Sequence, residues 1–251
     1  AFDDYNSISN DYVAGLDEKL KETSSSDTHS VNLDELIIVM NNNPLFIKMP
    51  ELKERFWDMF IVDSLIGNND RNNGNWGVIV NNMTSETRIA PVFDNGSAFN
   101  NKAGDNQMEK ILNDEERFIT SVYTSRRCIF SQDDKPINPL QYIETLKNED
   151  CNKALKRIVP NIEMDKIFNI IYSIENEYKG LRVTSDIQKK YYYECIKYRY
   201  EKVLLPAFEK YQNQRLEKNT TTESNLTLEE LQALLNERQI DNDFGLDEPE
   251  F

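Results

Sequence analysis

A chain of 251 residues is long enough to bury a substantial hydrophobic core. Its formal net charge of -15 argues against a nucleic-acid-binding protein, because affinity for a phosphate backbone comes mainly from basic side chains. One histidine and three widely spaced cysteines argue against a histidine-based zinc site, a Ser-His-Asp triad and a disulfide framework. The sequence has no signal-peptide segment and no long apolar run, so we expect a cytoplasmic protein that does not contact a membrane.

The first helical signals follow a polar segment that we assign to residues 1–32. Apolar residues at helical spacing predict a helix over residues 33–40, closed by the sequence N-N-N-P. Pro50 suits the first position of a second helix, which we expect to stop at Gly67 in a left-handed cap. The side chains expected on its buried face are Leu52, Phe56, Met59, Phe60 and Ile66. This helix would deliver the following loop from a rigid, buried element.

The most informative segment follows this helix and reads I-G-N-N-D-R-N-N-G-N-W-G-V-I-V over residues 66–80. A second apolar stretch, residues 89–93, ends at Asp94. If residues 76–80 and 89–93 pair as a β-hairpin, Asn75 and Asp94 come to the same end of it. Asp70 then lies nearby on the preceding loop.

Two carboxylates and a carboxamide in this arrangement suit phosphoryl transfer from a magnesium-bound nucleotide. Kinase-like sites use one Asp to accept the substrate hydroxyl proton, and an Asn and a second Asp as oxygen ligands of the metal. The pattern favours these roles for Asp70, Asn75 and Asp94, respectively. The alternative is that all three are turn residues, because Asp and Asn favour tight loops. Neighbouring asparagines support that alternative: Asn68, Asn69, Asn72, Asn73, Asn81 and Asn82.

A resemblance to the HipA family of bacterial serine/threonine kinases is carried by residues 51–99, which include E-R-F-W-D-M-F-I-V-D-S-L-I-G-N-N-D-R-N-N-G-N-W-G and I-A-P-V-F-D-N-G-S. The block is most similar to the HipA-like C-terminal domains that occur as stand-alone open reading frames. Family members carry an N-x-D-R-H-x-x-N loop and an A-P-x-Y-D-x-x-S segment. The resemblance extends over most of residues 33–211, although its sharp motifs lie in this one segment.

The resemblance implies a role for each residue of the set. Asp70 matches the catalytic Asp of the family, while Asn75 and Asp94 match its two metal-binding residues. It also implies ATP and Mg²⁺ as cofactors and a protein Ser or Thr hydroxyl as the phosphate acceptor. Two positions depart from the family pattern: Asn72 stands where relatives carry His, and Phe93 where they carry Tyr. The first departure concerns a supporting role, and the second keeps an aromatic ring.

Two parts of an active kinase are not recognisable in this sequence. Kinases hold the phosphates with a glycine-rich loop and a lysine on a strand, yet no G-x-G occurs here and no such strand precedes the catalytic loop. The chain opens at Ala1 without an initiator Met. We therefore expect the large lobe of a kinase, mainly α with a small β-hairpin at the site, that lacks the amino-terminal lobe and is inactive alone.

Residues 100–135 follow the second metal-binding Asp, where a kinase has its activation segment. Arg126 or Arg127 could pair with a phosphate on a nearby hydroxyl. The hydroxyl side chains that could carry it are Thr120, Ser121, Thr124 and Ser125. The alternative, which the unspecific pattern favours, is a solvated loop.

Two longer helices are predicted next. The first has an apolar face over residues 164–174 and ends near Gly180, and the second begins at a Thr184 or Ser185 cap and runs toward Pro206. The second helix carries five tyrosines: Tyr191, Tyr192, Tyr193, Tyr198 and Tyr200. They could stack on nucleic-acid bases, but the acidic charge favours rings packed on a core.

The carboxyl end is expected to form a separate unit. Residues 212–225 are polar and lack periodicity, which indicates a linker. Residues 226–251 combine an amphipathic helix, opened by the capping box T-L-E-E, with an acidic tail. That helix could dock on its own domain or on a regulatory partner.

Three functions are compatible with these patterns. The favoured one is a HipA-type kinase that transfers the ATP γ-phosphoryl group to a protein Ser or Thr with Mg²⁺, in a setting similar to toxin–antitoxin systems. The second is a catalytically inactive, kinase-like binding module. The third is a metal-dependent phosphohydrolase that uses the same acidic residues but would need further metal ligands.

Overall fold

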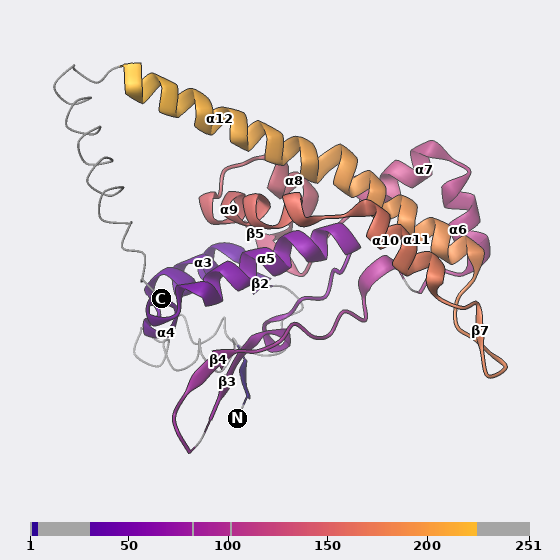
Figure 1. Ribbon diagram of the computed structural model, residues 1–251, viewed down its shortest axis with the longest axis horizontal. Helices are drawn as coiled ribbons and strands as arrows, with labels where there is room; N and C mark the ends of the chain where they lie inside the picture. The colour runs from indigo at the N-terminus through magenta and orange to yellow at the C-terminus, as the bar shows by residue number, and fades with distance from the viewer. Residues whose placement is uncertain (1, 5–30, 82, 101, 225–251) are drawn as a thin grey trace, which may run out of the picture. The chain divides into compact units, whose positions relative to one another are not determined.

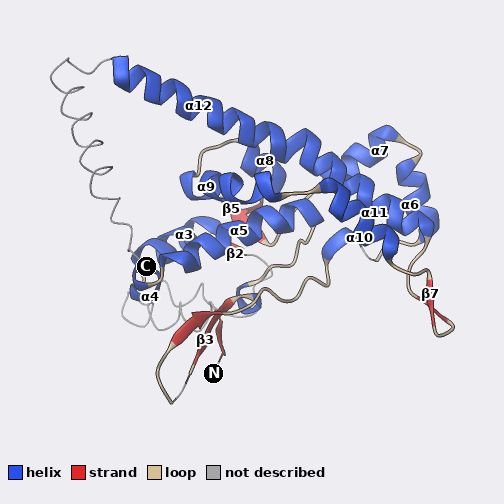
Figure 2. Ribbon diagram, in the orientation of Figure 1, coloured by secondary structure: helices blue, strands red, loops and turns tan. Residues whose placement is uncertain are grey.

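The computed structural model describes residues 2–4, 31–81, 83–100 and 102–224. The chain divides into two compact units, residues 1–208 and residues 209–251. Helices dominate the described part, and the strands are short (Figure 2). The expectation of a mainly helical fold is confirmed. None of the helices in these ranges combines the length and the apolar character needed to cross a membrane.

The two helices predicted first begin at the expected residues, and a short helix that was not predicted lies between them. Helix α3 spans Leu33–Asn42, and the side chain of Asn32 accepts hydrogen bonds from the amides at its start. Helices α4 (Pro44–Lys48) and α5 (Pro50–Ile66) each begin with a proline, whose missing N–H is not needed there. Gly67 ends α5 with φ 72°, the left-handed conformation that favours glycine.

Helix α5 is the central element of the main hydrophobic core. Helices α8 (Pro139–Glu144) and α9 (Glu149–Ile158) pack against it, and Figure 1 shows both near α5. Of its five predicted core side chains, Ile66 is half-buried. The other four are buried: Leu52, Phe56, Met59 and Phe60. The ring of Phe56 lies 5.1 Å from that of Trp76. This contact joins α5 to the start of the hairpin.

The expected β-hairpin is formed by β3 (Gly77–Val80) and β4 (Thr87–Ile89), with Val78 opposite Ile89. The prediction that the second strand covers residues 89–93 is wrong, because β4 ends at Ile89. Pro91 explains the early end, since proline has no N–H to donate to a ladder. A third strand, β1 (Phe2–Asp4), pairs with β3 on its other side (Figure 1).

Two further small sheets were not predicted. One joins β2 (Val31–Asn32), β5 (Phe130–Gln132) and β6 (Lys135–Pro136), and the other is a hairpin of β7 (Glu177–Tyr178) and β8 (Leu181–Arg182). Short 3₁₀-helical turns lie at Asn73–Asn75 and Val159–Asn161, whereas the turn at Ala98–Asn100 has a positive φ at Phe99 and Asn100.

The expectation of a solvated loop over residues 100–135 is wrong. This segment contains α6 (Asp105–Leu112), α7 (Glu115–Ile119) and a π-helical turn, Thr120–Thr124. Val122 of the turn is fully buried in a second core cluster with Met108 of α6. The turn is therefore fixed by packing.

The later helices follow the predicted order. Helix α10 spans Met164–Ser173, and Ser185 caps α11 (Asp186–Arg199) by accepting a hydrogen bond from the Gln188 amide. Tyr191 is buried and the other four tyrosines are partly buried against the two cores, which confirms the packing interpretation. A π-helical turn, Tyr200–Leu204, then leads into α12.

Helix α12 spans Leu205–Ser224, so most of the residues predicted as a linker, 212–225, are helical. No glycine or proline occurs between residues 207 and 224, so nothing in the backbone interrupts the helix. The predicted amphipathic helix and acidic tail, residues 226–251, lie outside the described residues, as do residues 5–30 of the predicted polar segment.

Candidate active site

The loop that leaves α5 places Asp70 and Asn75 next to each other. Asp70 is exposed, whereas Asn75 is buried, with 8% of its surface accessible. The Asn75 Nδ2 atom donates a hydrogen bond of 3.1 Å to the carbonyl oxygen of Asp70. This bond occupies the amide nitrogen of Asn75, so its oxygen is the atom that could bind a cation.

Asp94 lies beyond the end of β4 and is exposed. Its φ of 56° is in the left-handed region, which Asp tolerates better than most residues. The Ala90 amide donates to the Gly77 carbonyl at 3.0 Å, so the two strands stay paired up to the end where Asn75 precedes β3 and Asp94 follows β4. The hairpin therefore brings both residues to one end, as its antiparallel pairing requires.

Arg71 connects the loop of Asp70 to the segment of Asp94. Its guanidinium donates to the carbonyl oxygen of Phe93 and, at 2.6 Å, to the Oδ1 atom of Asn95. Both acceptors flank Asp94 in the chain. Only 3% of the Arg71 surface is exposed, so this link is shielded from water. The two segments that carry the predicted site residues are thus held together by one buried side chain.

Asp63 of α5 anchors this link. Its carboxylate accepts from Arg71 Nε at 2.8 Å and from Arg71 Nη2 at 3.0 Å, and also from Asn68 Nδ2 at 3.0 Å. A bidentate carboxylate–guanidinium pair of this kind is strong and geometrically specific. Neither Asp63 nor Arg71 was predicted from the sequence. The signal that could have found the pair is an acidic residue inside the apolar run F-I-V-D-S-L-I of a buried helix.

Two asparagines of the loop are turn residues. Asn72, which replaces the family His, accepts a hydrogen bond from the Gly74 amide at 2.8 Å through its side chain. The Asn68 Oδ1 atom lies 3.5 Å from the Asp70 amide nitrogen. The turn interpretation therefore describes the asparagines that shape the loop.

Comparison with known proteins identifies the family. No family model matches the chain. The chain is 40% identical, over 151 residues, to the serine/threonine-protein kinase CtkA of Helicobacter pylori, an alignment that covers 60% of this chain and 45% of CtkA. The crystal structure described as a Helicobacter pylori proinflammatory kinase CtkA superposes with a TM-score of 0.74 and 30% identity, and covers 86% of this chain and 72% of that one. The chain belongs to the CtkA kinase family.

The shared part is limited in length. The aligned region spans about 45% of the curated CtkA sequence, and the structural match extends over more of the fold than the sequence match. Homology to CtkA supports a kinase function in general terms.

The donor atoms of this CtkA-family chain fit Mg²⁺ chemically. Asp70 and Asp94 supply exposed carboxylates, and Asn75 supplies a carboxamide oxygen; Mg²⁺ binds through such hard oxygen ligands. Among the described residues, no group of three or more His, Cys, Asp and Glu side chains is placed to hold a metal ion. The candidate metal ligands are one carboxylate, Asp94, and one carboxamide, Asn75, while Asp70 is the candidate base.

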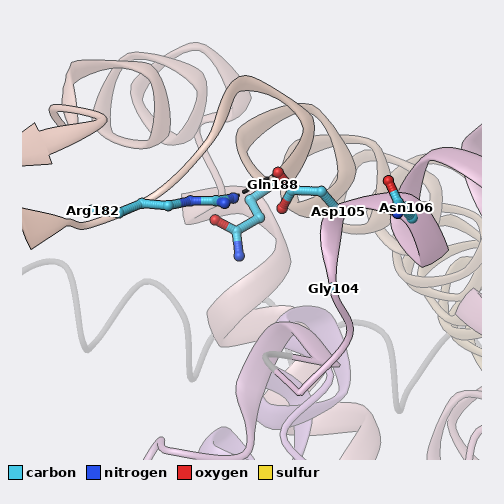
Figure 3. Close-up of a pocket in the computed structure, with 5 residues that line it drawn as sticks. All are labelled: Gly104, Asp105, Asn106, Arg182 and Gln188. Carbon is cyan, nitrogen blue, oxygen red and sulfur yellow. Dashed lines mark hydrogen bonds and ion pairs between the residues drawn. The ribbon is translucent and has the colours of Figure 1, made fainter.

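An open pocket of about 520 Å³ lies at the start of α6 in the CtkA-family chain (Figure 3). Its lining consists of Gly104, Asp105, Asn106, Arg182 and Gln188. An ion pair of 2.6 Å between Arg182 and Asp105 crosses it and joins β8 to α6. None of the predicted site residues lines this pocket.

We predict that Asp63→Ala destabilises the protein by about 3–5 kcal/mol, because it leaves the buried Arg71 guanidinium without its carboxylate. The measurement is the free energy of unfolding from denaturant titration. Asp58→Ala is the matched control on the same helix, because Asp58 pairs with Arg157 near the surface at 2.8 Å. Its cost should be about 1 kcal/mol or less. Equal losses for the two variants would contradict the role given to Asp63.

Proposed function

We propose that residues 33–211 form the large lobe of a HipA-type serine/threonine protein kinase. The reaction is transfer of the ATP γ-phosphoryl group to a Ser or Thr hydroxyl of a protein, with Mg²⁺. The observation that carries this proposal is the Arg71 link, which ties the residues on both sides of Asp94 to the loop of Asp70 and Asn75. Homology to a serine/threonine kinase supports the same reaction class.

Each residue has a distinct proposed role. The exposed Asp70 carboxylate orients the acceptor hydroxyl and takes its proton, while Asn75 and Asp94 would hold the metal through oxygen atoms. Mg²⁺ held there would neutralise charge on the phosphates. Arg71 and Asp63 touch neither substrate nor metal in this scheme; they fix the two segments relative to each other.

The test is a phosphotransfer assay on the full-length protein that contains this chain, with a protein mixture as acceptor and with or without Mg²⁺. Mg²⁺-dependent phosphoserine or phosphothreonine supports the kinase proposal. Release of phosphate from simple phosphomonoesters without transfer would favour a phosphohydrolase. If neither activity is detected, a binding module is favoured. Such a module could act through the carboxyl-terminal helix and a regulatory partner in the cytoplasm.

We predict that the 251-residue chain alone binds ATP and Mg²⁺ weakly or undetectably by calorimetric titration. The reason is that a glycine-rich loop and a phosphate-binding lysine are not recognisable in it, which leaves only the metal ligands. The full-length protein is the control and should bind more tightly. Micromolar affinity of the 251-residue chain would contradict the assignment of this chain to a large lobe alone.

A further inference from the structure

A half-buried arginine from the segment after Asp94 reaches the end of α5. Arg126 follows the π-helical turn Thr120–Thr124, and its Nη2 atom donates a hydrogen bond of 2.6 Å to the carbonyl oxygen of Gly67. The two residues are 59 positions apart in the chain. Burial is the largest influence on the pKa of Arg126 and lowers it. The contact joins the π-helical turn to the residue from which the Asp70 loop departs.

A second arginine, Arg199 of α11, holds the same helix end. Its Nη1 atom donates to the Leu65 carbonyl at 3.0 Å, and its Nε atom donates to the Val122 carbonyl at 3.2 Å. Only 3% of Arg199 is exposed, and burial lowers its pKa to about 10, so it stays charged at neutral pH. Arg199 therefore bridges α5 and the π-helical turn directly.

Gly67 is shaped to this arrangement. A Cβ atom at position 67 would lie 2.7 Å from Arg199 Nη1, closer than real side chains approach, and the φ of 72° also favours glycine. The absence of a side chain lets the Arg199 guanidinium reach the last carbonyl groups of α5.

The chemistry of helix ends explains why arginines are found here. The last carbonyl groups of a helix have no intrahelical donor and carry partial negative charge, which cations stabilise. Within the described ranges, neither Arg126 nor Arg199 forms an ion pair with a carboxylate, and the acceptors named above are backbone carbonyl oxygens. The two positive charges thus act on the backbone that leads into the loop of Asp70.

We propose that Arg126 and Arg199 are positioning residues of the kinase site. Both arginines connect residues 120–126 to the end of α5, so the placement of the Asp70 loop depends on how residues 120–126 pack. The kinetic part of this inference rests on the proposed kinase function. The structural part, control of the loop by the two arginines, does not.

The consequence for catalysis is a loss of alignment. If Arg126 is removed, the Gly67 carbonyl loses its partner and the loop gains freedom only three positions before Asp70. A misplacement of about 1 Å at a reacting group can cost about 10²-fold in rate. ATP affinity depends on the phosphate and metal ligands, so it should change much less than the rate.

The first experiment measures hydrogen exchange on the 251-residue chain. The observed amides are those of Asn68 and Asn75, which donate to the carbonyl oxygens of Asp63 and Asn72, respectively. The amides of helix α9 serve as the internal reference. Arg126→Ala should raise the ratio of loop exchange to α9 exchange about tenfold or more, whereas Arg126→Lys, which keeps a donor, should stay within about threefold of the unmodified chain.

Arg127→Ala is the matched control, because Arg127 is exposed and donates to the carbonyls of Thr124 and Arg126, which lie within three positions of it. It should leave the ratio unchanged. If Arg126→Ala gives the same ratio as Arg127→Ala, the proposal is overturned. General destabilisation would raise loop and α9 exchange together and leave the ratio unchanged, so that result also overturns the proposal.

The second experiment measures phosphotransfer by the full-length protein. Arg126→Ala should lower kcat about 10²-fold with the KM for ATP within a few-fold of the unmodified protein, and Arg126→Lys should recover most of the rate. A rise in KM without a fall in kcat would overturn the positioning role. If the unmodified protein shows no phosphotransfer, the kinase proposal fails, while the exchange ratio still decides whether the arginines control the loop.

Discussion

Replacing Asp70 by Ala is expected to lower phosphotransfer by the full-length protein by about 10²–10⁴-fold, the usual contribution of a general base. The affinity for ATP with Mg²⁺ should change little, because the proposed metal ligands, Asn75 and Asp94, remain. The measurement combines the phosphotransfer rate with a nucleotide titration. The substitution should not disturb Asn75. The Asp70 side chain is exposed, and Asn75 donates its hydrogen bond to the backbone carbonyl of Asp70, which Ala retains.

Asn72→Ala is the control for Asp70→Ala. Asn72 lies in the same loop, and its side chain accepts a hydrogen bond from the Gly74 amide. The substitution should therefore reduce phosphotransfer mildly. Near-normal phosphotransfer by Asp70→Ala would show that the kinase assignment of this loop is wrong, whatever the homology to CtkA.

Asp94→Ala is expected to be at least as damaging as Asp70→Ala, and different in kind. It removes a proposed metal ligand, so the variant should bind ATP poorly or lose the dependence of ATP binding on Mg²⁺. The measurement is nucleotide affinity with and without Mg²⁺, together with the rate. Retained, Mg²⁺-dependent ATP binding would remove Asp94 from the metal site.

Asp133→Ala controls for the backbone conformation at Asp94. Asp133 is also exposed and has a positive φ, 50° against 56° for Asp94, but it lies in the turn between β5 and β6. Placing Ala at either position imposes a comparable left-handed strain. If Asp133→Ala impaired phosphotransfer as strongly as Asp94→Ala, strain would explain both effects and metal binding would not be needed.

The relative position of Asp70 and Asp94 is set by other residues, which have no proposed contact with substrate. Arg71 holds the backbone beside Asp94, and Asp63 holds Arg71. The same helix end receives Arg126 and Arg199 from later parts of the chain. The end of α5 is thus where the loop of Asp70, the segment of Asp94 and the π-helical turn are all tied to one rigid helix.

The sequence alone determined the elements whose signals are local. Pro50 and Gly67 set the bounds of α5, because proline suits a first turn and glycine a left-handed cap. Two apolar stretches on either side of a polar turn predicted the hairpin, and antiparallel pairing then required Asn75 and Asp94 to share one end. The grouping of the candidate residues therefore follows from local sequence signals.

The tertiary structure decided what depends on distant partners. The acidic residue within the apolar run of α5 marks Asp63 as buried, but local pattern does not name Arg71 as its partner. Nor does it indicate that β1 would join β3 or that the segment around Val122 would be buried. Arg199 lies 134 positions from the carbonyl it holds, a separation that no periodicity spans. Buried ion pairs and helix-end contacts arise only when the chain brings their groups out of water together, and this is why the support of the site, unlike its proposed chemical groups, could not be predicted from the sequence.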